Sequence, residues 1–278
     1  MAGRKRRAED IEGGGSAAGG STTSTSAPSD SKSDSFQRQC LSVIFRDKRL
    51  RVSEDRMSVV SSNAESGYSS ILATSSASSG RWYFEIIVEE MPEGSHIRVG
   101  WSTRRTRYDT PIGSDCFSYA IRDMDCARVT LGKRWDARND SSICIKQGDV
   151  VGCLLELPLT VNSPRTTEDP MTFFPNLLCD PENVTEPEFF DEANSSITFF
   201  VNGNIVGEQP AFTNLVKGEY YPAVSLYGKV KVRFDFEAQR AKDLDAKCAA
   251  EMYVPPSMIK PKKRPTNFIP RGLMASGA

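Results

Sequence analysis

Residues 80–102 read GRWYFEIIVEEMPEGSHIRVGWS and contain two apolar runs separated by turn residues. The runs, Trp82–Glu89 and His96–Trp101, are rich in the aromatic and β-branched side chains that are typical of strands. Pro92 and Gly94 lie between them and favour a turn. The stretch therefore predicts two β-strands of a folded core.

Short runs of the same kind recur on both sides of this stretch. Because turn residues separate them regularly, they predict an all-β sandwich or barrel. One hairpin is explicit at Phe199–Val206, where Asn202-Gly203 suits the positive φ angles of a type I′ turn. The other predicted strands are Ser42–Phe45, Met57–Val60, Tyr68–Ala73, Cys116–Arg122, Val150–Leu155, Ile197–Val201, Ile205–Glu208, Tyr221–Leu226 and Val230–Phe236.

Composition excludes several classes of protein. The 278 residues carry 35 basic and 36 acidic side chains, a net charge of −1, so affinity for a polyanion requires a local patch. No apolar run approaches the roughly 18 residues of a membrane span, and the N-terminus has no signal-peptide core. The seven cysteines lack paired spacing, which indicates reduced thiols of an intracellular protein and argues against a zinc site.

Three segments differ in composition from the strand-rich region. Residues 1–35 are mostly Gly, Ser, Thr, Ala and charged residues, so we predict a disordered tail. Residues 36–240 are the predicted sandwich, with a long acidic insertion at 158–195 whose phenylalanines favour partial packing on the sandwich. For residues 241–278 we expect a short, marginal helix, beginning near Glu237, and a basic tail.

The basic tail contains a compact run of cations. Such a run is a candidate nuclear import signal, and together with the cluster at Arg4–Arg7 it is a candidate for weak nucleic-acid contact. The residues of the candidate signal are Lys260, Lys262, Lys263 and Arg264.

The order of motifs over residues 40–236 resembles a SPRY domain. Within that family it is most similar to the SPRY domain of the Ash-two-like trithorax subunit of COMPASS- and MLL-type complexes, which methylate lysine 4 of histone H3. The Met91-Pro92 turn, the Arg98–Ser102 strand and the long insertion before Asn202 favour this subfamily. The resemblance implies a bent sandwich of two antiparallel sheets.

The resemblance also implies a function. Subfamily members are non-catalytic nuclear subunits that grip an acidic or phosphorylated segment of the WD-repeat scaffold subunit and stimulate the SET-domain methyltransferase. Full-length members carry N-terminal zinc-finger and winged-helix modules, which we do not expect here. They also carry a C-terminal amphipathic helix, of which Glu237–Met252 is a poor version, so we expect a weakened contact with the small dimeric helical subunit.

Two arginines on predicted strands carry the binding hypothesis. Alternation directs Arg98 away from its apolar neighbours, and Arg122 shares a face with Ser118 and Ala120. If the apolar side chains face the core, both guanidinium groups point outward, and the small residues could leave a shallow concavity beside Arg122. Two guanidinium forks suit a carboxylate-rich or phosphorylated peptide.

The subfamily's acidic-peptide pocket corresponds to Tyr68, Arg98, Pro111 and Arg122 in this sequence. In that arrangement Tyr68 supplies a hydroxyl and a flat apolar wall, and Pro111 shapes the rim.

Two positions depart from the subfamily pattern. Ser114 replaces a second tyrosine and Met124 replaces a lysine, so affinity or partner choice is expected to differ. The nearby cations that are candidates for supporting roles are Arg104, Arg105 and Arg107.

Other functions fit parts of the sequence. A SPRY receptor of the ubiquitin-ligase type would read another linear motif, although no adaptor box or RING-like cysteine array is visible, and an RNA- or DNA-associated SPRY protein would depend on the basic tails. Catalysis is disfavoured because the single histidine, His96, has no specific cysteine partner, and we predict no metal or cofactor. The three tryptophans, Trp82, Trp101 and Trp135, are expected to be core or packing residues and not ligand platforms.

Overall fold

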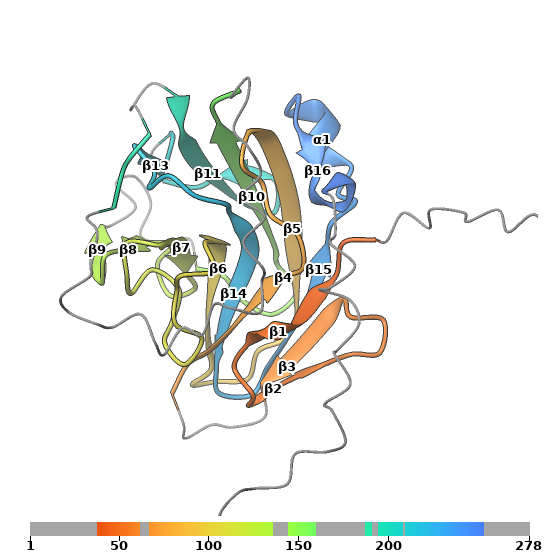
Figure 1. Cartoon of the computed structure of the whole chain (residues 1–278). Helices are drawn as coiled ribbons and strands as arrows, with labels where there is room; N and C mark the ends of the chain where they lie inside the picture. Colours follow the sequence, from red (N-terminus) through yellow and green to blue (C-terminus); the bar gives the residue numbers. More distant parts are fainter. Residues whose placement is uncertain are drawn as a thin grey trace, which may run out of the picture. The chain divides into compact units, whose positions relative to one another are not determined.

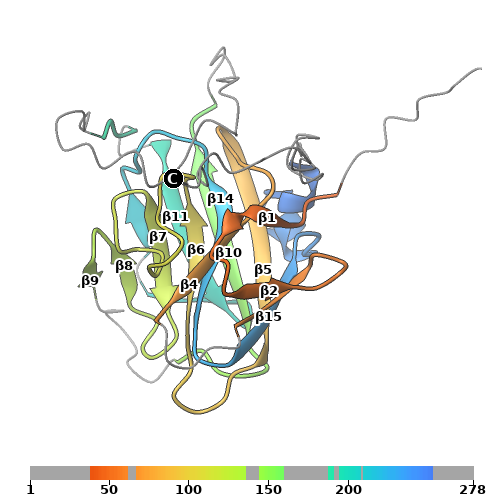
Figure 2. The same ribbon diagram turned by 60° about the horizontal axis from the view of Figure 1, so that its bottom comes forward.

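The computed structural model describes residues 38–61, 67–135, 144–159, 187–190, 194–207 and 209–252. The predicted N-terminal tail, the basic run at 260–264 and most of the acidic insertion lie outside these residues. The described part of the chain is built mainly from β-strands in two sheets that lie face to face (Figure 1, Figure 2). The predicted all-β sandwich is confirmed.

The first sheet has seven antiparallel strands and carries the candidate site. Its middle strands come from distant parts of the sequence, because β14 lies between β4 and β6. In spatial order the strands are β1 (Leu41–Arg46), β4 (Ser69–Ala73), β14 (Tyr221–Tyr227), β6 (His96–Ser102), β7 (Ser118–Arg122), β8 (Arg128–Thr130) and β9 (Lys133–Trp135).

The second sheet has nine strands and is antiparallel except for one short parallel pair between β16 and β5. Two short strands lie off the main path: β13 pairs with β11, and β16 pairs with β5. The main path is β12 (Asn204–Ile205), β11 (Ser196–Val201), β10 (Val150–Leu157), β5 (Gly80–Glu90), β15 (Val230–Asp235), β3 (Ser58–Ser61) and β2 (Leu50–Val52), and the two others are β13 (Phe212–Thr213) and β16 (Lys247–Cys248).

An aromatic group forms the centre of the core between the two sheets. The ring of Phe84 on β5 meets the indole of Trp101 on β6 edge-on at 4.9 Å between centroids and stacks on Phe234 of β15 at 5.9 Å. All three side chains are essentially inaccessible to solvent. Burial of each such side chain stabilises the fold by about 1.5–3 kcal/mol, so this contact joins the sheets strongly.

The three tryptophans differ in burial: Trp101 is a core residue, as expected, and Trp135 does not belong to the core. Trp101 is fully buried, whereas Trp82 is half-buried and donates its indole N–H to the Ser79 carbonyl. Trp135 is 36% exposed because β9 is the last strand of its sheet.

Gly100 allows β6 and β7 to approach closely. A Cβ atom at this position would lie 1.9 Å from the carbonyl oxygen of Tyr119 on the neighbouring strand. Only a residue without a Cβ atom allows this close backbone approach.

The Asn202-Gly203 hairpin has the predicted geometry. Asn202 has φ 50° and Gly203 has φ 80°, and the turn joins β11 to β12. Both central residues of a type I′ turn require positive φ, and Asn-Gly tolerates this at low cost.

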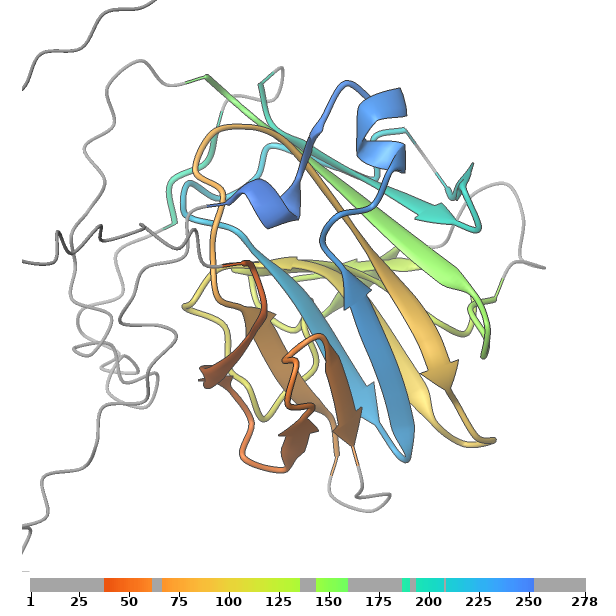
Figure 3. The same cartoon turned by 90° about the vertical axis from the view of Figure 1, so that its right-hand side faces the viewer.

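The segment after β15 differs from the helix expected near Glu237–Met252. The helix α1 spans four residues, Arg240–Asp243, and is followed by β16 and the 3-10 turn η3 (Ala249–Glu251). Ala238 and Ala241 pack against Tyr83 and other apolar side chains of the nine-stranded sheet. Figure 3 shows the short helix, in blue, beside this sheet. The backbone of β16 pairs with β5, so the helix does not continue through this segment.

Candidate functional site

Arg98 and Arg122 lie directly opposite each other on neighbouring strands. The register of β6 and β7 pairs their Cα atoms, and side chains that are paired in this way emerge on the same face of a sheet. Ile97 and Val99 are fully buried in the inter-sheet core, so both arginines lie on the outer face. The outward direction predicted from alternation is confirmed, although each arginine is half-buried.

The contacts of the Arg98 side chain within the described residues include no carboxylate. Its Nη1 donates to the Ile112 carbonyl at 3.1 Å, and its guanidinium carbon lies 5.4 Å from the Tyr68 ring centroid. Its Nε is buried and has no hydrogen-bond acceptor among the described residues. Within the same residues, Arg98 forms no ion pair. Burial, followed by the adjacent positive charge of Arg122, lowers the pKa of Arg98.

Arg122 has an acidic partner that it shares. Its Nε lies 3.1 Å from Asp125, and the other oxygen of Asp125 lies 2.9 Å from Arg134 on β9. The Nη2 of Arg122 also approaches the sulfur of Met124 at 2.8 Å. Arg122 and Arg134 thus share the Asp125 carboxylate, whereas Arg98 pairs with no carboxylate in the described part of the chain.

The second carboxylate near the arginines, that of Asp123, contacts other groups. Asp123 accepts a hydrogen bond from the Ile97 N–H at 3.1 Å, and its other oxygen lies 2.9 Å from Nδ1 of His96. The chain's single histidine therefore contacts a carboxylate.

Tyrosine rings form a wall beside Arg98. The Tyr68 ring lies 5.3 Å from the Tyr227 ring, which in turn stacks on His96 at 5.9 Å. Burial raises the pKa of Tyr68, so its hydroxyl stays protonated at neutral pH. Sequence reasoning missed Tyr227, although it is the last residue of the strand that pairs with β6.

Pro111 begins the turn that supports Arg98. The Ser114 N–H donates to the Pro111 carbonyl at 3.2 Å, and the turn places the Ile112 carbonyl against the Arg98 guanidinium. Four predicted residues, Tyr68, Arg98, Pro111 and Arg122, are therefore connected to one another through strand pairing, a ring contact and this turn.

The expected concavity beside Arg122 is absent from the described surface. Ser118 and Ala120 are fully buried, and Ile112 packs with Ala120 in a small cluster on the outer face of the sheet. The Gly113 N–H donates to the Ser118 hydroxyl at 2.7 Å. Small side chains leave a concavity only where no loop covers them. Here the loop before β7 covers Ser118 and Ala120.

The candidate supporting cations make contacts outside this group. Arg104 lies over the Phe45 ring, Arg105 lies 4.1 Å from the centroid of Phe117, and Arg107 pairs with Asp109 at 2.8 Å. Their contribution through the electrostatic field stays a prediction. The substituted positions, Ser114 and Met124, are both exposed.

Two negative observations complete the description of the site. The described residues contain no group of three or more His, Cys, Asp or Glu side chains that could hold a metal ion. Among the same residues, no helix is long and apolar enough to cross a membrane.

The two-sheet sandwich thus presents paired arginines beside an aromatic wall on the outer face of its seven-stranded sheet. A model of the SPRY domain family matches residues 81–160, and the chain belongs to this family. Its SPRY region is related to those of the ASH2-type subunits. A solved SPRY domain, that of human HERC1, is 15% identical with a TM-score of 0.46, covering 72% of this chain and 99% of that one.

Two curated relatives illustrate the ASH2 relationship. The Set1/Ash2 histone methyltransferase complex subunit ASH2 of Drosophila melanogaster is 34% identical over 201 residues, covering 69% of this chain and 34% of the relative. The corresponding subunit ash-2 of Caenorhabditis elegans is 32% identical over 199 residues, covering 63% and 34%. The chain spans about a third of the length of these relatives.

Proposed function

We propose that this chain is a non-catalytic regulatory subunit of a histone H3 lysine-4 methyltransferase complex. In this proposal the outer face of the seven-stranded sheet binds an acidic segment of the WD-repeat scaffold subunit. Two relatives that bear the name Set1/Ash2 histone methyltransferase complex subunit support the assignment to such a complex. The same names support a nuclear location and a subunit role without catalysis.

The observation that carries the binding proposal is the pairing of Arg98 with Arg122. Two like charges directly across a ladder repel each other, and the half-buried Arg98 has no carboxylate partner in the described part of the chain. An acidic ligand would relieve this repulsion and satisfy the buried Nε of Arg98. The free protein thus keeps an arrangement that an anionic partner stabilises.

The geometry favours carboxylates spaced along an extended peptide. Paired residues on adjacent strands have Cα atoms about 4.5–5.5 Å apart, whereas side chains two residues apart in an extended peptide are separated by about 6.6 Å. Flexible arginine forks can therefore each take one carboxylate, or one phosphate and one carboxylate. The Tyr68 ring would cover the aliphatic part of the bound segment.

A capture experiment from nuclear extract tests the proposal. The tagged chain should retain WD-repeat and SET-domain subunits, read by mass spectrometry, and Arg98→Ala should lose them. Arg81→Ala is the matched control, because Arg81 is a half-exposed strand arginine on the other sheet that pairs with Glu156 at 3.2 Å. Retention of the same subunits by Arg98→Ala, Arg122→Ala and the control alike would reject this face as the binding surface.

A further inference from the structure

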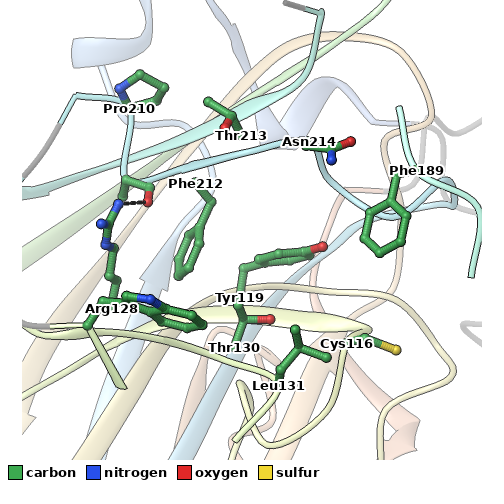
Figure 4. Close-up of a pocket in the computed structure, with 12 residues that line it drawn as sticks. Cys116, Tyr119, Arg128, Thr130, Leu131, Phe189, Pro210, Phe212, Thr213 and Asn214 are labelled. Atoms are coloured by element: carbon green, nitrogen blue, oxygen red, sulfur yellow. Dashed lines mark hydrogen bonds between the residues drawn. The ribbon is translucent and has the colours of Figure 1, made fainter. Parts of the chain in front are cut away.

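A pocket of about 410 Å³ opens at the β9 edge of the sandwich. One wall comes from β7, β8 and β9, and the other comes from the segment around Phe212 and from Phe189 (Figure 4). Tyr119 and Phe212 form a buried apolar floor, with their rings 5.2 Å apart. The Tyr119 hydroxyl accepts the Val216 N–H at 3.0 Å, so its oxygen already has a partner within the protein.

Exposed apolar side chains gather around this pocket. Leu131 is 53% exposed, Phe189 is 45% exposed and Trp135 is 36% exposed, and all three line it. Burial raises the pKa of the Cys116 thiol on the same wall, so that side chain is neutral at physiological pH. The walls therefore suit a large apolar group, and the exposed rim has apolar area that a partner could cover.

Leu131 adopts a backbone conformation that is unfavourable for its side chain. It forms a two-residue turn with Gly132 between β8 and β9, with φ 56° and 66°. Asn202-Gly203 makes the same kind of turn in the same protein with the residue types that tolerate it. A bulky residue at positive φ is an outlier, and because the Leu131 side chain is exposed, its burial in the core does not offset the backbone strain.

The hairpin that carries Leu131 is cationic. Residues 128–135 contain Arg128, Lys133 and Arg134 and no acidic residue. Arg128 donates to the Ala211 carbonyl across the pocket, as Figure 4 shows, and Arg134 shares Asp125 with Arg122. The pocket rim is thereby linked to the arginine pair by one carboxylate and complements an acidic chain.

We propose that this pocket is a second contact for the acidic partner segment, and that it takes one large aliphatic or aromatic side chain of that segment. The inference rests on the proposed binding at Arg98 and Arg122 and adds an apolar anchor to it. Arg122 lies on β7 and Trp135 on β9, so their strands are about 10 Å apart, but Arg122 is on the outer face of the sheet, whereas Tyr119 and Trp135 line the pocket from the inner face. The partner segment would therefore pass around the β9 edge, which needs more than the roughly three extended residues that cover about 10 Å and places the anchor several residues from the carboxylates in sequence.

A series of fluorescein-labelled synthetic peptides tests the inference with the full chain. One consists of alternating Asp and Gly, and a set of others replaces one Gly at a time by Phe. Fluorescence anisotropy should show that Phe at one or two positions tightens binding at least about fivefold, because a buried aromatic group adds hydrophobic contact. Leu131→Asn should remove this gain, leave affinity for the Asp-Gly peptide unchanged and raise the melting temperature, since Asn suits the turn.

Controls separate the possible outcomes. Ile205→Asn changes an exposed apolar residue on the other sheet, outside the pocket, and should keep the gain from Phe. If Phe adds nothing at any position, or the gain survives Leu131→Asn, the pocket contact is wrong, while weaker binding of the Asp-Gly peptide to Arg98→Ala still supports the arginine site. Dimerisation of the wild type that Leu131→Asn abolishes would assign the pocket to a second copy and overturn the proposal.

Discussion

Arg98 and Arg122 face each other across the β6–β7 ladder, but only Arg122 has a carboxylate partner in the described part of the chain. The second carboxylate nearby, that of Asp123, accepts from a backbone N–H and lies beside His96. A protein selected only for stability would place an acid beside Arg98 or replace it by an apolar residue.

Arg98→Met should stabilise the fold while it removes binding. Methionine has a similar length, buries without a charge and ends both the repulsion with Arg122 and the unsatisfied Nε. We expect the free energy of unfolding, measured by urea titration, to rise by about 1 kcal/mol. Arg233→Met is the control, because Arg233 is exposed and pairs with Asp55. Clear destabilisation by Arg98→Met would show that the hydrogen bond to Ile112 and the contact with the Tyr68 ring outweigh the repulsion from Arg122.

Asp125→Asn should strengthen binding of an acidic peptide. Asp125 partly neutralises Arg122 and Arg134, so its removal leaves more positive charge for a ligand. The pair is partly exposed, and we expect a gain of about 0.5–1 kcal/mol, or roughly two- to fivefold in affinity, which shrinks at high salt. Asp109→Asn, which removes the ion pair between Asp109 and the exposed Arg107, is the control. Weaker binding by Asp125→Asn would mean that the carboxylate holds Arg122 in its binding position.

Gly100→Ala should destabilise the sheet that carries the site. The added methyl group would meet the Tyr119 carbonyl oxygen, which is backbone and cannot turn away. Overpacking of this kind costs about 1–3 kcal/mol, measurable as a lower urea midpoint with an unchanged slope. Gly218→Ala meets only the Thr103 methyl group at 3.2 Å and should cost less. Equal losses in the two variants would contradict the close approach of β6 and β7.

The stability of the fold should fall at alkaline pH. Burial raises the pKa of the Cys126 thiol to about 12, above its ordinary value of about 8.5–9. The folded state therefore holds a proton that the unfolded state loses first, so the contribution of this thiol is complete below pH ~9 and is lost as pH rises towards ~12. The slope is at most about 1.4 kcal/mol per pH unit for this group.

Cys126→Ala isolates that contribution. The variant should show a shallower decline of unfolding free energy between pH ~9 and ~12, because alanine keeps the Cβ atom and has no proton to lose. Part of the decline should remain, since burial also raises the pKa of Tyr221 to about 12. An identical decline with and without the thiol would contradict the assigned burial of Cys126.

Much of the fold could be predicted because its longer strands bury one face. In β6 and β7 the apolar residues alternate with polar or small ones, so strand position and the outward direction of both arginines follow from period-two patterning. Strands of two or three residues, such as β9 and β13, were missed because so few residues show no period. The exposure of Trp135 was missed for the same reason, since hydrophobicity alone does not identify an edge strand.

For the site, the sequence could predict only the outward direction of the two arginine side chains and the types of residue involved. The direct opposition of Arg98 and Arg122 depends on the register of two strands, and the loop between them does not reveal that register. The cover that Ile112 forms over Ala120 depends on the path of the same loop. The resemblance to a family identified Tyr68 and Pro111, which no local pattern would have selected.

The affinity of an acidic peptide for four forms of the chain tests the central claim most directly. Fluorescence anisotropy with an alternating Asp-Gly peptide should show binding that weakens with salt, and loses about 1–3 kcal/mol, or roughly 5- to 150-fold, in Arg98→Ala and in Arg122→Ala. Arg81→Ala should bind as the wild type does. Equal affinity of all four forms, or loss only in Arg81→Ala, would contradict recognition by the paired arginines.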